Sequence, residues 1–283
     1  PAAEGAPPAI LLAPTDLSEL SRVGVRYALN LARALGAEVT VYHVVDQGDL
    51  MESPNSVLER YQLALARFLN DHFSDLTPWL KVREKLEIGR PAENIVERAR
   101  KEGSDLIVMS THGRTGLARA LRGSVAEDVL RHSPFPVLLC NPHSLPDGSR
   151  PSELRFRRIL VPTDGSEASA AAIPLVEEFG QWGEVEAILL HVAAVYPDPL
   201  GYPVATILPT SEDAAQVVEQ FANRFDRAKV KVRTRVAFGL PETQIVQAAI
   251  AEGADLVAMT THGRTGFARF LLGSVTEYVL RAS

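Results

Sequence analysis

Short apolar runs alternate with amphipathic segments through the first half of the chain. The runs are rich in β-branched residues and apolar on both faces, which is typical of buried parallel strands. The segments between them have the 3.6-residue period of helices that cover a sheet. This pattern predicts strands at about 10–13, 39–45, 82–88, 106–110 and 137–140, separated by helices at about 18–35, 54–71, 92–101 and 124–132. Gly36 and Gly103 are the predicted stops of two of these helices.

The second half repeats this pattern with one strand fewer. Its apolar runs predict strands at about 159–163, 187–192, 230–238 and 256–260, and no later run corresponds to 134–140. The predicted fold class is therefore α/β, with two copies of a five-stranded, Rossmann-like parallel-sheet domain, the second copy lacking its last strand in this chain.

An internal repeat explains why the two halves agree. Residues 103–131 and 253–281 align without gaps at an offset of 150, with 20 of 29 positions identical. Pro14-Thr15-Asp16 matches Pro162-Thr163-Asp164 at an offset of 148. A period of this length is too long for a solenoid and indicates a duplicated domain. We predict domains at 1–141 and 157–283, joined by a linker at 142–156 that is rich in proline and polar residues.

Composition removes several functional classes. The chain has 283 residues, 29 basic and 35 acidic, so its net charge of −6 disfavours general nucleic-acid binding. Its one cysteine, Cys140, permits neither an intrachain disulfide nor a cysteine-rich metal site. No apolar run is long enough to span a membrane, and the first residues do not resemble a signal peptide. We therefore expect a cytoplasmic protein.

The loop after the fourth strand is the longest nearly identical segment of the repeat. Ligands of open parallel sheets bind beyond the carboxyl ends of the strands, which is where this loop begins. Its glycines would let the backbone approach a ligand closely, and the helix that opens at Gly123-Ser124 would favour a phosphate group. The spacing matches neither a Walker P-loop nor a GxGxxG dinucleotide motif.

The repeated sequence T-H-G-R-T-G-(L/F)-A-R-x-L-x-G-S-V-x-E, with the upstream P-T-D and the strand ending H-V, closely resembles the universal stress protein family. The resemblance covers nearly all of both halves. It implies a tandem member with strand order 3-2-1-4-5 in each domain. Many members bind ATP through a G-x-x-G-(nine residues)-G-(S/T) motif, in which Ser110 and Thr260 replace the first glycine here. In ATP-binding members this glycine lies close to the ribose, so a side chain here could crowd the sugar, or a small Ser or Thr could be tolerated with its hydroxyl facing the sugar.

The resemblance also implies the binding residues, and any Mg²⁺ would be held by the phosphates of the ATP. The residues expected to line the nucleoside pocket are Pro14, Asp16, Val44, Met109 and Ser110 in the first half and Pro162, Asp164, Val192, Met259 and Thr260 in the second. Those expected to hold the phosphates are Gly113, Gly123, Ser124, Val125 and Ala126, then Gly263, Gly273, Ser274, Val275 and Thr276. The hydroxyl of Thr276 would give the second half one more phosphate donor.

Several of these residues also have a structural interpretation. Ser124 and Glu127 have the spacing of a helix capping box, as do Ser274 and Glu277. Asp16 and Asp164 could cap the first helix of their domain instead of contacting a ligand.

The histidines favour structural roles. His43 and His191 lie on buried strands, where we expect them to satisfy core hydrogen bonds. His112 and His262 have no paired nucleophile, so they are weak candidates for a catalytic base. Arg114 and Arg264 could reach phosphates or lie in solvent.

We therefore expect a stress-response regulatory module that binds ATP in one or both domains and is at most a weak ATPase. The alternative is a stress protein that binds no nucleotide and acts through protein–protein interaction. A homodimer of tandem chains, or an intrachain pseudo-dimer, is the expected assembly, and the signalling partner is unknown.

Overall fold

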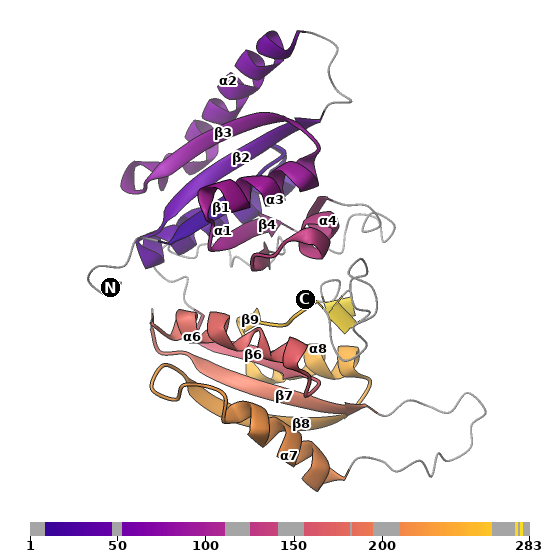
Figure 1. Ribbon diagram of the computed structural model, residues 1–283. Coiled ribbons are helices and arrows are strands. Elements are labelled where there is room, and N and C mark those ends of the chain that lie inside the picture. Colours follow the sequence, from indigo (N-terminus) through magenta and orange to yellow (C-terminus); the bar gives the residue numbers. More distant parts are fainter. Residues whose placement is uncertain are drawn as a thin grey trace, which may run out of the picture. The chain divides into compact units, whose positions relative to one another are not determined.

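The computed structural model describes residues 9–46, 53–110, 125–140, 156–181, 183–194, 210–261, 275–276 and 278–279. The chain divides into two compact units, Pro1–Leu154 and Arg155–Ser283. Each unit is a parallel sheet with helices packed against it (Figure 1). The predicted α/β class is thereby confirmed for both halves.

The first unit has a five-stranded parallel sheet in the order β3-β2-β1-β4-β5, which is the predicted order. Its elements are β1 (Ile10–Pro14), α1 (Glu19–Leu35), β2 (Glu38–Asp46), α2 (Pro54–Phe73), the 3-10 helix η2 (Thr77–Trp79), β3 (Val82–Gly89), α3 (Pro91–Glu102), β4 (Leu106–Ser110), α4 (Val125–His132) and β5 (Val137–Cys140). The bounds differ from the predicted ones by at most two residues. Gly36 and Gly103 are the C-cap residues of α1 and α3, as predicted.

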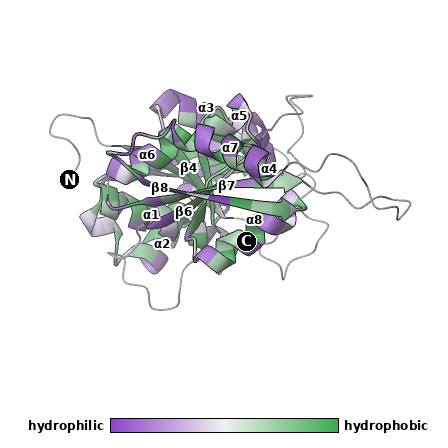
Figure 2. Cartoon of the chain, turned by 90° about the horizontal axis from the view of Figure 1, so that it is seen from below, coloured by the Kyte–Doolittle hydropathy of each residue, from purple (hydrophilic) through white to green (hydrophobic). Residues whose placement is uncertain are grey.

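The two faces of the first sheet are covered by different helices. Alternate residues of the strands, among them Leu12, Tyr42 and Met109, form a buried cluster with side chains of α3 and α4. Because successive residues of a strand point to opposite faces, His43 and Ser110 lie on the other face, where they meet α2 and α1. The helices of both units show hydrophobic and hydrophilic faces in Figure 2, as the periodicity predicts.

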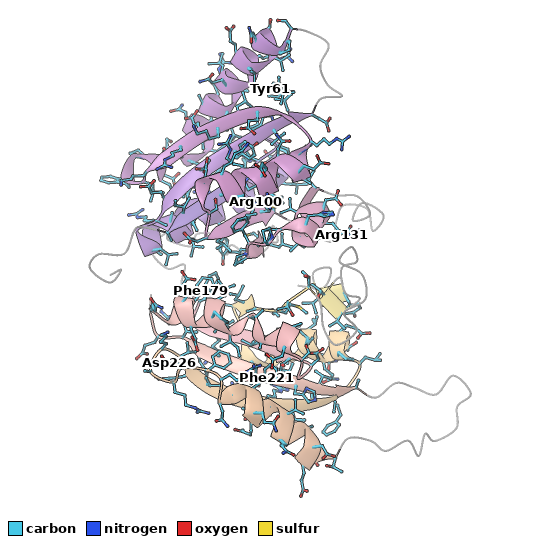
Figure 3. The ribbon with its side chains drawn as sticks, viewed as in Figure 1. Tyr61, Arg100, Arg131, Phe179, Phe221 and Asp226 are labelled. Carbon is cyan, nitrogen blue, oxygen red and sulfur yellow. The ribbon has the colours of Figure 1, made fainter. Side chains whose placement is uncertain are left out.

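The second unit has a four-stranded sheet among its described residues, in the order β8-β7-β6-β9. Its elements are β6 (Arg158–Thr163), α5 (Glu167–Ala170), α6 (Ile173–Gln181), β7 (Glu186–Ala194), α7 (Ser211–Ala222), β8 (Lys231–Gly239), α8 (Pro241–Glu252) and β9 (Leu256–Val257). The expected loss of one strand is confirmed for the described part of the chain. Phe156, at the end of the expected linker, is buried against Phe179 of α6 with ring centroids 4.9 Å apart (Figure 3).

Two predictions for the second unit need correction. The strand predicted at 256–260 ends at Val257. In the first unit the last three residues of β4 pair with β5, and no described strand supplies such pairing for Ala258–Thr260. The first helix is also divided, because Pro174 lacks the N–H that would continue α5 and its ring would clash with the carbonyl of Ala170.

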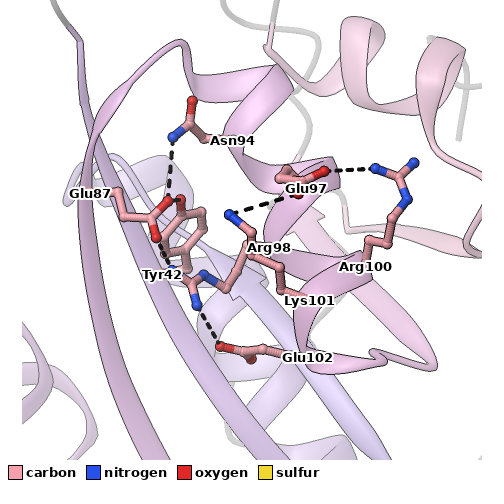
Figure 4. A network of polar contacts seen from close by, with 8 residues as sticks. All are labelled: Tyr42, Glu87, Asn94, Glu97, Arg98, Arg100, Lys101 and Glu102. Carbon is pink, nitrogen blue, oxygen red and sulfur yellow. Dashed lines mark hydrogen bonds and ion pairs between the residues drawn. The ribbon is translucent and has the colours of Figure 1, made fainter.

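A network of charged side chains lies beside the apolar cluster on the α3 face of the first unit (Figure 4). The guanidinium of Arg98 contacts Glu87 of β3 and Glu102 of α3, and it lies over the ring of Tyr42. The hydroxyl of Tyr42 donates to Glu87 at 2.6 Å, and that of Thr40 donates to Glu102 at 2.6 Å. At the offset of 150, Ala237 and Ala248 stand where Glu87 and Arg98 stand, so the pair of Arg98 and Glu87 is particular to the first unit. In the second unit, Arg233 and Arg235 of β8 pair with Glu252 instead.

The aspartate before each fourth strand has a structural role. Asp105 accepts a hydrogen bond from the amide of Ile10, and Asp255 accepts one from the amide of Arg157 at 2.8 Å. Each carboxylate thereby ties the start of the fourth strand to the start of the first. This contact gives the aspartate directly before the fourth strand the same role in both halves.

Candidate functional site

The expected nucleoside residues of the first half lie along one edge of its sheet. Pro14 ends β1, Val44 lies near the end of β2, and Met109 and Ser110 end β4. These strands are neighbours and parallel, so their carboxyl ends meet at the same edge. In the second half, Pro162 and Val192 lie on neighbouring strands in the same way, and Met259 and Thr260 follow β9.

A compact hydrogen-bonded loop follows β1. The hydroxyl oxygens of Thr15 and Ser21 are 2.8 Å apart, and the Ser21 hydroxyl donates to the carbonyl of Ser18 at 3.0 Å. Asp16 accepts a hydrogen bond from the amide of Ser18 at 3.0 Å. These contacts fold the chain back on itself between β1 and α1, so that Asp16 has a defined position at the sheet edge.

The loop after β6 has the same contacts. The hydroxyl oxygens of Thr163 and Ser169 are 2.8 Å apart, and Asp164 accepts from the amide of Ser166 at 3.0 Å. The signal for this loop is the repeated spacing T-D-x-S-E-x-S, which starts at Thr15 and Thr163. Sequence reasoning used only its first two residues and missed the four serines.

Neither aspartate caps a helix. Ser18 is the N-cap of α1 and accepts from the amide of Ser21, while Ser166 does the same for α5. The alternative role considered for Asp16 and Asp164 is therefore wrong. Burial alone would raise the pKa of Asp16, but hydrogen bonds from Ser18 and Ser21 outweigh it and hold that pKa below its ordinary value. Asp16 is consequently an anion at neutral pH.

The residue after each aspartate has a left-handed backbone. Leu17 has φ of 66° and Gly165 has φ of 83°. Glycine adopts this conformation without steric cost, whereas a leucine is strained there. Both halves thus need the same tight turn beside the aspartate, and the first half forms it with an unfavourable residue.

His43 is buried against the back of this loop. Its Nδ1 lies 2.8 Å from the carbonyl oxygen of Thr15, and its ring stacks on Tyr61 of α2 with centroids 5.0 Å apart (Figure 3). The counterpart, His191, makes the same contact with Thr163 at 2.9 Å. The predicted core role of both histidines is confirmed. Burial lowers the pKa of His43, although the Thr15 carbonyl and Asp16 oppose that shift.

The hydroxyl oxygen of Ser110 has a partner within the first unit. It accepts a hydrogen bond from the backbone amide of Gly24, in the middle of α1, at 2.7 Å. The contact joins the end of β4 to the helix beneath it. Ser110 therefore helps to hold the strand end in place.

Thr276 makes a comparable contact in the second half. Its hydroxyl donates to the carbonyl oxygen of Thr260 at 3.3 Å, and its side chain is buried. Val125 and Ala126 open α4 in the first half, and Val275 packs on the core cluster of the second. The carboxylate of Glu127 pairs with Arg131, one turn further along α4.

The glycine-rich loops lie outside the described residues. This applies to the expected phosphate residues Gly113, Gly123, Ser124, Gly263, Gly273 and Ser274, and to His112, Arg114, His262 and Arg264. Within the described ranges, no three His, Cys, Asp or Glu side chains are grouped so that they could hold a metal ion. In the same ranges, no helix combines the length and apolar character required to cross a membrane.

Two parallel-sheet units, each with a Thr-Asp loop after its first strand, define a tandem Rossmann-like α/β protein. The model of the universal stress protein family matches residues 9–141 and 155–283. The chain therefore belongs to the universal stress protein family.

Individual relatives agree with this assignment. A universal stress protein of Mycolicibacterium smegmatis is 26% identical over 294 residues, which cover 96% of this chain and 94% of the relative. One of Methanocaldococcus jannaschii is 35% identical over 138 residues, covering 46% of this chain and 79% of the relative. A solved universal stress protein of Archaeoglobus fulgidus, 22% identical, has a similar fold with a TM-score of 0.69 over 97% of this chain and 93% of its own.

Proposed function

We propose that this universal stress protein binds an adenine nucleotide, ATP, in one or both halves and acts as a regulatory module of the stress response. The observation that carries the proposal is the hydrogen-bonded Thr-Asp loop, formed twice by the same side-chain contacts at the edge where parallel sheets bind ligands.

The described side chains fit the nucleoside part of ATP. Pro14 and Met109 are buried and Val44 is half-buried, so we assign the base to the apolar strand ends that these residues form. The ionised carboxylate of Asp16 accepts hydrogen bonds and repels phosphate, so it suits neutral donors such as an amino group or ribose hydroxyls. We assign the phosphates to the loops at Gly113–Ser124 and Gly263–Ser274, whose glycines and helix starts supply N–H donors.

The proposal includes Mg²⁺ only as part of the bound triphosphate. Magnesium that accompanies a nucleotide keeps several waters and needs few protein ligands.

We further propose that hydrolysis is slow or does not occur. The imidazole of His43 is held against the Thr15 carbonyl and Tyr61, and Asp16 is held by Ser18. Neither group is arranged to activate a water molecule, which is the task of a general base.

Two measurements test nucleotide binding. Native mass spectrometry of freshly purified protein should show co-purified adenine nucleotide. Titration with labelled ATP should show saturable binding that the double variant Gly113→Ala/Gly263→Ala weakens at least tenfold. Unchanged affinity in the double variant would remove the assignment of the two loops, and no binding by the native chain would overturn the proposal.

The second candidate function is a stress protein that acts through a protein partner without nucleotide. Ser110 and Thr260, which replace the first glycine of the ATP motif, favour it. The absence of both co-purified and titratable nucleotide would support this candidate. A homodimer or an intrachain pseudo-dimer in the cytoplasm stays our prediction for the assembly, and sedimentation of the purified chain distinguishes the two.

A further inference from the structure

The end of β4 is held against α1 by an unusually close approach. The amide of Gly24 donates to the hydroxyl oxygen of Ser110 at 2.7 Å. A Cβ atom at Gly24 would lie 2.7 Å from the backbone nitrogen of Ser110 and 2.9 Å from the carbonyl carbon of Met109. Both atoms belong to the backbone, so neither can move without shifting the strand. The contact therefore requires glycine at this position of α1.

The second half has a different residue at the same place. Ala172 lies 148 residues after Gly24, the offset that relates every residue of the Thr-Asp loops. Its side chain is buried. Pro174, two residues later, divides the helix into α5 and α6, whereas α1 continues through Gly24 to Leu35. The end of β4 packs on an uninterrupted helix, and the second half has no such helix at the matching position.

Thr260, the counterpart of Ser110, is held from another direction. The hydroxyl of Thr276 donates to its carbonyl oxygen at 3.3 Å. Thr276 lies at the start of the last helix, where the phosphates are assigned. Its hydroxyl proton cannot serve the Thr260 carbonyl and a phosphate oxygen equally well, so a bound phosphate would compete with this contact. The first half has Ala126 at the same position and no such competition.

We infer that the first half binds the adenine nucleotide more tightly than the second, and that Gly24 is a positioning residue for the first site. The inference rests on the proposed function. In the first half, the strand end that carries Met109 and Ser110 is fixed by α1 before the ligand arrives. In the second half, binding first requires the contact between Thr276 and Thr260 to break. Only the fraction of chains in which it is broken can bind, and the apparent affinity is reduced in proportion to that fraction.

Hydrogen–deuterium exchange measured over an ATP titration resolves the two halves within one native chain. Peptides spanning residues 10–35 report the first site, and peptides spanning 158–181 report the second. We expect protection of the first set at an ATP concentration about tenfold lower than that for the second. The full chain serves as its own control, because both sites experience the same free ATP.

Variants test whether the difference in ATP midpoint between the halves comes from the contact between Gly24 and Ser110. Gly24→Ala should raise the midpoint for residues 10–35 about tenfold and leave that for 158–181 unchanged. The double variant Ala172→Gly/Pro174→Arg, which gives the second half the residues of the first, should lower the midpoint for 158–181. Hydrogen exchange of residues 38–46 without ATP shows whether the Gly24→Ala chain is folded. If it is not folded, Ser110→Ala replaces it, because this variant removes the same hydrogen bond without a clash. Ser110→Ala should raise the ATP midpoint for residues 10–35 about threefold.

The outcomes separate the inference from the function on which it rests. If no peptide is protected at any ATP concentration, the chain does not bind ATP and both fail. If both sites are protected at the same concentration, or the second at a lower one, ATP binding stands and the ranking of the halves is wrong. If the first half binds more tightly but neither Gly24→Ala nor Ser110→Ala moves its midpoint, the positioning role of Gly24 is wrong.

Discussion

The imidazole of His43 donates from Nδ1 to the carbonyl oxygen of Thr15 at 2.8 Å, beneath the loop that carries Asp16. The side chain is only 6% exposed, and its Nε2 has no partner among the described residues. One buried ring thereby joins β2 to the end of β1. Its protonation state should affect the stability of the first unit.

Acid should destabilise the first unit through His43. Burial holds the folded-state pKa of His43 below the ordinary value of 6.5, so the unfolded chain binds more protons as the pH falls through that region. The stability contributed by the neutral ring is present above about pH 6.5 and is lost as the pH falls toward the folded pKa. Calorimetric melting at about pH 7.5 and about pH 5.5 should show this loss. His43→Asn, which cannot titrate, should show a smaller difference between the two pH values, and an equal difference would contradict the assignment.

Leu17 should be a source of backbone strain. Its φ of 66° is favourable for glycine, which occupies the same position in the second half as Gly165. We expect Leu17→Gly to be more stable than Leu17→Ala by about 1 kcal/mol, because both lose the side chain and only glycine relieves the backbone. Gly165→Ala should lose about the same free energy. Chemical denaturation of the three variants measures these differences, and equal stability of the two Leu17 variants would show that the turn is not strained.

Arg98 should stabilise the first unit far more than an exposed arginine does. Its side chain is 16% exposed and lies between Glu87 and Glu102, which are 31% and 10% exposed. Arg98→Ala leaves two partly buried carboxylates without their cation and should cost about 2 kcal/mol or more of unfolding free energy. The exposed pair of Arg100 and Glu97 provides the control, since Arg100→Ala should cost less than about 0.5 kcal/mol (Figure 4).

A double variant tests whether the stability lost in Arg98→Ala comes from the carboxylate that is left without its cation. Arg98→Ala combined with Glu87→Ala produces the alanine pair that the second unit has at positions 237 and 248. We expect it to recover part of the stability lost in Arg98→Ala. A double variant less stable than the sum of the single changes would show that packing, and not charge, dominates at this position.

Cys140 should be unreactive in the folded protein. It ends β5, pairs in register with Ser110, and is 1% exposed. Burial raises the pKa of its thiol well above the ordinary value, so very little thiolate is available as a nucleophile. Alkylation by iodoacetamide should be slow under native conditions and complete in denaturant. Rapid alkylation of the native chain would show that β5 opens readily.

Local patterns of the sequence predict most of the fold. Strands and helices follow from hydrophobic periods within about ten residues, and the duplication follows from identities at offsets of 148 and 150. The failures occurred where one half departs from the other. Pro174 divides a helix that the first half forms without interruption, and the strand predicted at 256–260 ends at Val257 because no described neighbour pairs with its last residues.

The sequence also predicts only part of the candidate site. From the sequence alone, the repeated P-T-D and glycine motifs predicted two candidate sites and indicated which residues end the strands, because a strand end is a local feature. Only the tertiary structure decided that Ser110 meets Gly24, that Thr276 meets Thr260 and that His43 supports the Thr-Asp loop. These partners lie between 16 and 86 residues apart in the chain, and their contact depends on how closely a helix can approach a strand. The close approach of α1 to β4 requires glycine at position 24, and the second half has Ala172 at the matching position.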